Sequence, residues 1–266
     1  MKTYRTVSEA YLATLEDIYK NPDYMVAPRG LPIREKLDYT FKVLEPTSDP
    51  IVTRDLERNK VIADYTAKEM ELYNSCSNKV EDFAKASKFW NQIANPDGTV
   101  NSAYGYLIWK NKSHGSHFNK HTVLIEGQFE DGEVGKFLVE ENVMVTPWDW
   151  CVDSLKRDKD TRQAILRFSL PEHFWVGNKD MTCTLHGNWL IREDKLHLSV
   201  VMRSNDWNKG ILYDAPWFCS LIDKMVDELK STYPSLSKGN YTHTAHSAHI
   251  YEKDAQIVEK MLGFKL

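Results

Sequence analysis

The segment Lys179-Asp-Met-Thr-Cys183-Thr-Leu-His-Gly-Asn188-Trp contains the most informative residue of the chain, Cys183. Arg203, in Met202-Arg-Ser-Asn-Asp206, follows it by twenty positions, and Asp214 follows Arg203 by eleven. A thiol, a cation and a carboxylate suit covalent attack on a pyrimidine nucleotide: the thiol adds to the ring, the guanidinium holds a phosphate, and the carboxylate pairs with a base edge. A lone Cys is more often a small core residue. The spacing to Arg203 and Asp214 favours a catalytic one.

These spacings resemble the thymidylate synthase superfamily, the pyrimidine C5-transferases. Its members have a nucleophilic Cys, an Arg-Ser-x-Asp motif twenty residues later, and an Asn or Asp that recognises the base eleven residues beyond the Arg. The resemblance extends from about residue 26 to Tyr251, and the sequence is most similar to the phage-type deoxycytidylate hydroxymethylases. It implies an α+β thymidylate synthase fold, with a mixed sheet packed by helices and a dimer formed through the sheet.

Three residues match the catalytic groups of this superfamily. The resemblance makes Cys183 the nucleophile that adds to C6 of the pyrimidine, and Thr184 stands where the methylating synthases have His, as is typical of the hydroxymethylases. Glu69 matches the catalytic glutamate, and Tyr104 matches the tyrosine that hydrogen-bonds a water relay. On the residues alone, Glu69 is more simply a solvated side chain on a charged helix, and Tyr104 a core aromatic beside a turn glycine. A thiol needs positive surroundings to ionise near neutral pH, and Arg203 would supply part of them.

The resemblance also implies the residues that bind the two substrates. Phosphate binding falls to Arg203, Arg29 and Arg162, and the segment with Arg162 reaches into the partner subunit's site, which implies a symmetric homodimer. Most synthases have a second arginine directly after it, whereas this chain has Gln163. The remaining implied contacts are to the nucleotide from Asn188, Ser204, His249 and Tyr251, the last two at the sugar 3′-hydroxyl, and to folate from Asp206 and Trp90.

Asp214 bears on the identity of the base. A uracil edge offers a donor at N3 and an acceptor at O4, which an Asn amide matches, whereas cytosine reverses both. A carboxylate accepts from the cytosine amino group, and a protonated one also donates to N3, so Asp favours cytosine. An alternative is a helix N-cap, because Ala215-Pro216-Trp217 follows and a helix is expected from Pro216 to about Ser231.

The expected reaction is C5-hydroxymethylation of dCMP, with 5,10-methylenetetrahydrofolate as co-substrate and no metal. The methylating synthases end in a long segment that closes over the folate, whereas only 15 residues follow Tyr251 here, so water is expected to reach the exocyclic methylene. The alternatives are a dCMP 5-methyltransferase, a CMP hydroxymethylase and a dUMP-specific synthase-like enzyme. A catalytically silent nucleotide-binding homologue, such as a translational repressor, is disfavoured by the intact catalytic residues.

Composition sets wider bounds. The chain has 266 residues, 42% of them hydrophobic and 27% charged, with a net charge of −4, which fits one globular domain and argues against a general nucleic-acid binder. Four cysteines without a CxxC pair predict reduced thiols in a cytoplasm, the host's if the gene belongs to a phage. No apolar run has the length of a membrane span, and the first residues lack a signal-peptide core.

Periodicity predicts the elements. Thr6 and Glu9 form a capping-box pattern that opens a helix. Residues 111–141 are expected to form an inserted hairpin with its turn at Asp131-Gly132. The histidines of Tyr241-Thr-His-Thr-Ala-His-Ser-Ala-His249 suggest a metal tract, but they cannot share one strand face. Further helices are expected at 52–73, 80–93 and 148–156, and strands at 39–44, 164–170 and 189–203, the last interrupted at 192–195.

Overall fold

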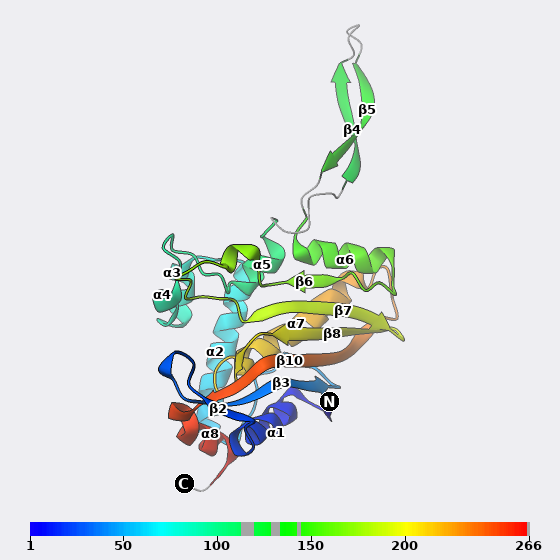
Figure 1. The fold of residues 1–266 in the computed structure, drawn as a ribbon. Helices are drawn as coiled ribbons and strands as arrows, with labels where there is room; N and C mark the ends of the chain where they lie inside the picture. The colour runs from blue at the N-terminus through cyan, green and yellow to red at the C-terminus, as the bar shows by residue number, and fades with distance from the viewer. Residues whose placement is uncertain (113–119, 129–133, 143–144, 265–266) are drawn as a thin grey trace.

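The computed structural model describes residues 1–112, 120–128, 134–142 and 145–264, and describes no side chains between 113 and 144. Its centre is a mixed sheet in the order β1-β3-β10-β8-β7-β6, with β2 paired to β3 and β9 paired to β10 (Figure 1). Pairing is parallel between β1 and β3 and between β8 and β10, and antiparallel along the rest of the main path. The strands are β1 (Lys2–Tyr4), β2 (Tyr24–Val26), β3 (Ile33–Val43), β6 (Ile165–Arg167), β7 (Thr184–Arg192), β8 (Lys195–Met202), β9 (Asn205–Asp206) and β10 (Ser237–Tyr251).

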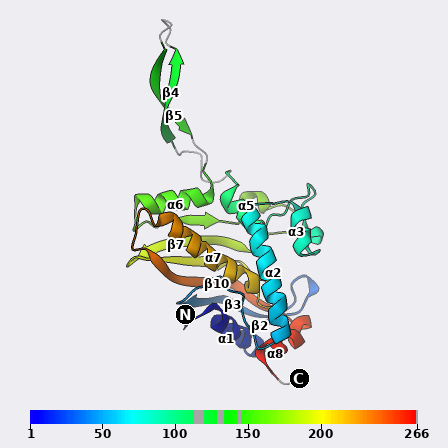
Figure 2. The same ribbon diagram turned by 180° about the vertical axis from the view of Figure 1, so that it is seen from behind.

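Two long helices cover one face of this sheet. Figures 1 and 2 show α2 and α7 behind the strands in one view and in front of them in the other, which confirms the α+β prediction. The opposite face has no helix over it in the described part of the chain. The helices are α1 (Val7–Lys20), α2 (Leu56–Ser75), α3 (Val80–Ala86), α4 (Trp90–Ile93), α5 (Tyr104–Trp109), α6 (Pro147–Arg157), α7 (Ile211–Leu229) and α8 (Ala255–Leu262), with short 3₁₀ turns η1 (Pro28–Gly30), η2 (Pro171–His173) and η3 (Glu252–Asp254).

The capping-box prediction for α1 is confirmed. The Thr6 side chain accepts a hydrogen bond from the Glu9 backbone nitrogen at 3.2 Å, and the Glu9 carboxylate accepts one from the Thr6 nitrogen at 3.3 Å. Each bond satisfies a backbone donor that the first helical turn leaves free. The apolar face of the helix then buries Leu15 and Ile18 completely.

The predicted start of α7 was wrong. The helix begins at Ile211, five residues before Pro216, and Gly210 occupies its N-cap position. Asp214 therefore lies in the first turn of the helix and is not its cap. The chain becomes helical early because Ile211 and its neighbour Leu212 are fully buried and extend the apolar face of the helix, with Pro216 placed inside it.

Residues 80–93 form two short helices instead of the single predicted one. Ser87 separates α3 from α4 with an extended backbone, φ −154° and ψ 130°. Its hydroxyl accepts a hydrogen bond from the Phe89 backbone nitrogen at 3.3 Å. A serine that bonds to nearby backbone groups offers the chain an alternative to the helix, which explains the break.

The predicted hairpin is confirmed as a two-stranded antiparallel sheet. Its strands β4 (Lys120–Gln128) and β5 (Val134–Asn142) pair with Leu124 opposite Leu138. Both views show it extending away from the main sheet (Figures 1 and 2). The expected turn at Asp131-Gly132 lies outside the described residues. The hairpin follows α5 and precedes α6 along the chain.

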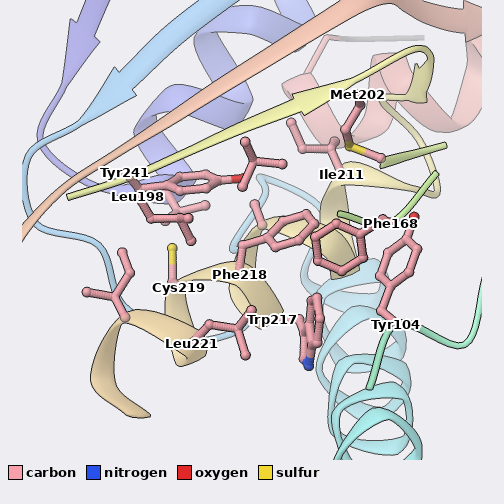
Figure 3. Close-up of a cluster of buried hydrophobic side chains, with 14 of the residues drawn as sticks. Tyr104, Phe168, Leu198, Met202, Ile211, Trp217, Phe218, Cys219, Leu221 and Tyr241 are labelled. Atoms are coloured by element: carbon pink, nitrogen blue, oxygen red, sulfur yellow. The ribbon is translucent and has the colours of Figure 1, made fainter. Parts of the chain in front are cut away.

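An aromatic cluster packs between the sheet and the helices beside it. Figure 3 shows Tyr104, Phe168, Trp217 and Phe218 grouped together, and all four are buried. Packing is closest where α5 meets α2: a Cβ on Gly105 would lie 1.7 Å from the Tyr73 carbonyl oxygen, so only glycine fits there. Within the described residues, every helix is too short or too polar to cross a membrane.

Candidate active site

The β7–β8 hairpin explains the twenty-residue spacing between Cys183 and Arg203. Thr184 pairs with Met202 across the two strands, so the residues just outside this pair become neighbours. The Arg203 backbone nitrogen donates to the Cys183 carbonyl oxygen at 2.8 Å. Its guanidinium donates to the Thr182 carbonyl at 3.1 Å, and Nη2 lies 3.6 Å from the Cys183 sulfur. The predicted nucleophile and cation are therefore in direct contact.

The partly buried thiol of Cys183 lies in a field of opposing charges. Burial raises its pKa, and Asp214 and Asp180 add to the rise, while Arg203 and, more weakly, Arg29 lower it. The expectation that Arg203 favours the thiolate is correct in sign, but burial outweighs it. The protein alone therefore holds Cys183 mainly as the thiol, and thiolate formation needs further positive charge or a proton acceptor.

Arg29 lies on an exposed loop and has strained backbone geometry. Its φ is 53° and its ψ 30°, the left-handed region that side-chain-bearing residues rarely adopt, and Gly30 beside it has a φ of 77°. Such conformations persist where the surroundings impose them, often at ligand sites. The effect of Arg29 on the Cys183 thiol places its guanidinium on the same side of the molecule as Arg203.

Glu69 is a buried carboxyl, not a solvated one. It lies on α2 with 9% of its surface exposed, whereas Glu71 on the same helix is exposed. Burial raises its pKa well above the ordinary value, the nearby Asp214 raises it further, and hydrogen bonds from Tyr73 and Tyr65 oppose the rise. A carboxyl with a raised pKa can hold a proton near neutral pH and exchange it, as acid–base catalysis requires.

Asp214 lies opposite Glu69, in the first turn of α7. Burial raises the pKa of Asp214 to about 7, and a hydrogen bond from Asn205 opposes this rise. Its carboxyl thus populates both protonation states near neutral pH. That property matches the proton-donating and proton-accepting role expected of a group that pairs with cytosine.

Tyr104 lies near both the Cys183 thiol and the Asp214 carboxyl. It is buried, its ring stacks on that of Tyr73 at 5.2 Å, and the aromatic cluster of Figure 3 surrounds it. Burial raises the pKa of Tyr104, and Asp214 and Cys183 add to the rise, so all three groups share one environment. The Thr184 hydroxyl opposes the rise, although it makes no hydrogen bond of ordinary geometry with the protein.

Tyr65 and Tyr73 are site residues that the sequence analysis missed as such. They precede and follow Glu69 by four positions, and helical residues four apart share one face. Tyr65 also accepts a hydrogen bond from Trp90, whose buried ring packs edge-on against Phe83 at 4.9 Å. The i−4 and i+4 tyrosines were the available signal, and the predicted folate contact Trp90 connects to the glutamate through one of them.

His249 and Asp206, on neighbouring strands, form a second group near the site. The two residues are directly paired between β10 and β9, and the Trp207 nitrogen donates to the His249 carbonyl at 2.8 Å. Burial raises the pKa of Asp206, and His249 opposes the rise. Tyr251 packs edge-on against His249 at 5.2 Å. The predicted sugar and folate contacts are thus adjacent, and Ser204 lies between Arg203 and β9.

Two predicted contacts lie apart from this cluster. Asn188 lies on β7 opposite Ser199 and lines a cavity of about 230 Å³ with Lys42 and His197. Arg162 follows α6 and lines a separate cavity of about 560 Å³. Within one chain the structure does not bring either residue to Cys183. A residue that contacts the partner's site is expected to lie away from Cys183 of its own chain, as Arg162 does. The position of Asn188 does not fit the predicted nucleotide contact.

The histidines of β10 have separate partners. His243 is fully buried, accepts or donates at Nδ1 to the Tyr241 hydroxyl at 2.7 Å, and stacks on Phe41. His246 lies at the surface, where Nδ1 is 2.6 Å from Asp38. Across the residues that the structure describes, no three His, Cys, Asp or Glu side chains converge as a metal site would require.

Comparisons with known proteins identify the family of this chain. The family model of thymidylate synthase matches residues 9–264. The chain is 27% identical over 247 residues to the deoxycytidylate 5-hydroxymethyltransferase of Enterobacteria phage T6, covering 90% of this chain and 84% of that protein. It is 23% identical over 262 residues to the thymidylate synthase of Clostridium beijerinckii, covering 97% and 82%. The solved structure of thermostable thymidylate synthase A from Bacillus subtilis superposes with a TM-score of 0.63 at 17% identity, over 97% of this chain and 84% of that one, which shows a shared fold.

Proposed function

Because this chain belongs to the thymidylate synthase family, a family of one-carbon transferases, we propose that it hydroxymethylates C5 of dCMP. The co-substrates are 5,10-methylenetetrahydrofolate and water, and the products are 5-hydroxymethyl-dCMP and tetrahydrofolate. Similarity to the phage T6 deoxycytidylate 5-hydroxymethyltransferase supports this choice. The observation that most favours it is Asp214, a buried carboxyl with a pKa of about 7. It lies near Cys183 and Tyr104, because it raises the pKa of both.

Cys183 begins the reaction. Its thiolate forms a bond to C6 of the pyrimidine, the C5–C6 π bond breaks, and C5 becomes nucleophilic. Arg203 keeps the loop of Cys183 in place through the Thr182 and Cys183 carbonyls and has an exposed guanidinium for the phosphate. The Arg203 guanidinium would offset one of the two charges of the phosphate dianion, and Arg29 and the partner's Arg162 would offset the other. At the end of the reaction the S–C6 bond breaks and the ring double bond re-forms.

Glu69 and Tyr104 manage protons between these events. The proton on C5 leaves once carbon has been transferred. Tyr104, whose pKa both Asp214 and Cys183 raise, would order the water that removes this proton. Glu69, held by Tyr65 and Tyr73, protonates the departing amine and orders the water that supplies the new hydroxyl. Burial of Glu69 serves this role, because it keeps the proton on the carboxyl until it is needed.

The residues near Asp206 fit a polar ring such as folate. Arg58 Nε and Asn208 Oδ1 are buried without a protein partner, and Arg58 Nη2 donates to the Asn208 carbonyl at 3.1 Å. Buried polar atoms without a partner are rare, and a polar ligand would satisfy them. Asp206 and Trp90 would hold the folate, which when bound supplies a one-carbon unit at the methylene oxidation level.

The test is product analysis. The protein is incubated with methylenetetrahydrofolate and dCMP, CMP or dUMP, and the nucleotide mass and folate absorbance are followed. We expect 5-hydroxymethyl-dCMP without dihydrofolate, because hydroxymethylation releases tetrahydrofolate unoxidised. Stoichiometric dihydrofolate with 5-methyl-dCMP would establish methylation instead. Preference for dUMP would support the alternative represented by the Clostridium beijerinckii thymidylate synthase.

We place this reaction in a homodimer formed through the open face of the sheet, in a cytoplasm. If a phage encodes the chain, the product would enter modified phage DNA. The separation of Arg162 from the Cys183 cluster supports the dimer, because a phosphate contact from Arg162 then comes from the partner. The whole chain is proposed to act as one catalytic domain, with the β4–β5 hairpin as an insertion.

A further inference from the structure

A buried polar chain leads from β10 to the Asp214 carboxyl. The Tyr241 hydroxyl lies 2.7 Å from His243 Nδ1, and His243 Nε2 lies 3.4 Å from Asn205 Nδ2. Asn205 is in turn a hydrogen-bonding neighbour that opposes the rise of the Asp214 pKa, and its Nδ2 also contacts the Met202 sulfur at 2.9 Å. Tyr241 and His243 are fully buried and Asn205 is 3% exposed, so water reaches none of them freely.

The end of this chain at Asp214 is tightly packed. A Cβ on Gly210 would lie 2.3 Å from Asn205 Oδ1 and 3.2 Å from Asp214 Oδ2, so both oxygens converge on the space that glycine leaves. Asn205 Oδ1 is buried and has no hydrogen-bond partner in the protein. An amide can present its oxygen or its nitrogen to either neighbour, and the surrounding hydrogen bonds decide which.

The position of the proton on Asp214 decides which base it pairs with. A protonated carboxyl has one donor oxygen and one acceptor oxygen. With the donor oxygen at N3 and the acceptor at the exocyclic group it matches cytosine, and with the two exchanged it matches uracil. Protonation alone therefore does not select cytosine, and a neighbouring group must fix which oxygen donates.

The buried chain can fix that oxygen. If the Tyr241 hydroxyl donates to His243 Nδ1, then Nε2–H is a donor, and the Asn205 amide must turn so that its oxygen faces Nε2 in place of its nitrogen. The Asn205 nitrogen then faces Asp214 and donates to one of its oxygens, which becomes the acceptor. Reversing the His243 tautomer reverses every bond. Burial lowers the pKa of His243 to about 3, so the imidazole is neutral and its two nitrogens have opposite roles.

We propose that the buried chain Tyr241–His243–Asn205 fixes the donor and acceptor oxygens of Asp214 and thereby determines which pyrimidine the site prefers. These three are positioning residues that act through Asp214, and the inference rests on the proposed function. Besides Tyr241, five titratable groups face Asp214 and act on its charge without supplying this directional chain. They come from α2, α5 and the Cys183 loop and are Tyr65, Glu69, Tyr73, Tyr104 and Cys183.

The experiment is a double-mutant comparison of base preference. His243→Phe retains the stacking on Phe41 but removes both nitrogens, and Tyr241→Phe removes only the hydroxyl. Each is measured as the ratio of kcat/KM for dCMP to that for dUMP, in the wild-type and the Asp214→Asn background. Loss of one directional hydrogen bond is expected to reduce the wild-type ratio about three- to tenfold. In the Asp214→Asn background the same changes should leave the ratio unaltered, and His243→Gln, which keeps a polar atom near Nε2, should recover part of the preference.

Several outcomes overturn the proposal. An unchanged ratio in folded Tyr241→Phe and His243→Phe proteins contradicts it, as does an equal drop in both backgrounds. Calorimetric binding of dCMP and dUMP separates this failure from failure of the proposed reaction. A protein that binds dCMP preferentially but converts neither nucleotide contradicts the reaction, and the binding ratios of the variants then decide on the chain. A protein without any dCMP preference overturns both.

Discussion

Burial raises the pKa of the acidic groups on both sides of the site, and the two sides differ in the groups that oppose this rise. On the nucleophile side, burial raises the Cys183 pKa most, the charged side chains Arg203 and Arg29 oppose the rise, and Asp214 and Asp180 add to it. On the carboxyl side, Glu69 and Asp214 are nine-tenths buried, and the groups that oppose their pKa rise are hydroxyls and an amide. Charged neighbours let the Cys183 thiol ionise when a substrate binds, whereas the buried carboxyls of Glu69 and Asp214 retain their protons.

The difference also appears in how each side is held. Backbone hydrogen bonds and the guanidinium of Arg203 fix the Cys183 loop, and its other end is fastened by Asp180, whose carboxylate accepts from the Ser102 nitrogen at 2.9 Å. Because Ser102 lies two residues before Tyr104, this bond links the thiol loop to α5. Helix packing positions the carboxyls instead. Substitutions on the two sides should therefore fail in different ways.

The largest effect is expected at the thiol. Cys183→Ser should reduce turnover by roughly 10³-fold or more while nucleotide binding persists, because a hydroxyl is far less ionised than a thiol of similar size. Steady-state kinetics and calorimetric binding of dCMP measure the two effects separately. Cys76→Ala, a change at a thiol remote from the cluster, serves as the control and should retain activity. Wild-type turnover by Cys183→Ser would exclude the covalent mechanism.

On the carboxyl side, Glu69→Gln should lower kcat by about 10²–10⁴-fold, since an amide cannot exchange the proton. Glu71→Gln is the matched control, because Glu71 lies two positions along α2 and is exposed. Its activity should equal that of the wild type. Comparable losses in both variants would show that α2 tolerates neither change and that Glu69 has no special role.

The base preference tests Asp214. Asp214→Asn should shift preference from dCMP towards dUMP by roughly one to two orders of magnitude, because each mismatched buried hydrogen-bonding group costs about 1–3 kcal/mol. The ratio of kcat/KM values measures this shift. A variant that loses turnover of both nucleotides equally, or keeps the dCMP preference, would show that Asp214 does not pair with the base.

A smaller effect is expected from Arg162, which belongs to neither side within one chain. Arg162→Ala should weaken dCMP binding about tenfold, the value of one charge-assisted hydrogen bond. Mixing Arg162→Ala with Cys183→Ser protomers should give heterodimers with one active site of wild-type dCMP affinity, since that site combines an intact Cys183 with the partner's intact arginine. Verified heterodimers without activity would refute a contact across the interface.

Much of this organisation was predictable because it depends on local spacing. The distance from Cys183 to Arg203 specifies the β7–β8 hairpin, and the capping box specifies where α1 begins. The start of α7 was not predictable from Pro216, because burial of Ile211 prevailed over a strong local start signal. Asn188 was predicted as a nucleotide contact only because the family resemblance implied it. The pleat instead places it among the residues of a different cavity.

The polar partners of the carboxyls were harder to predict, because they depend on contacts between distant segments. Tyr65 and Tyr73 could have been found from their helical spacing to Glu69. Asn205 could not, since its meeting with Asp214 requires β9, α7 and β10 to be assembled first. Sequence spacing thus predicted the charged side of the site better than the buried side.

The last expected effect is on stability, not activity, and concerns how stability depends on pH. The pKa of Asp214 rises from 3.8 to about 7 on folding, so between these values the folded protein binds a proton that the unfolded chain has lost. Stability from this residue is therefore fully present below pH 4 and is lost as pH rises through 7. Asp214→Asn has no such titration, so the free energy of unfolding of the wild type relative to the variant should fall across this range, by up to roughly 4 kcal/mol. Urea unfolding at pH 4, 5.5 and 7.5 measures the difference. A wild-type advantage that grows with pH would mean that Asp214 is stabilised as the anion, and then the carboxyl side would be tuned by charge, as the nucleophile side is.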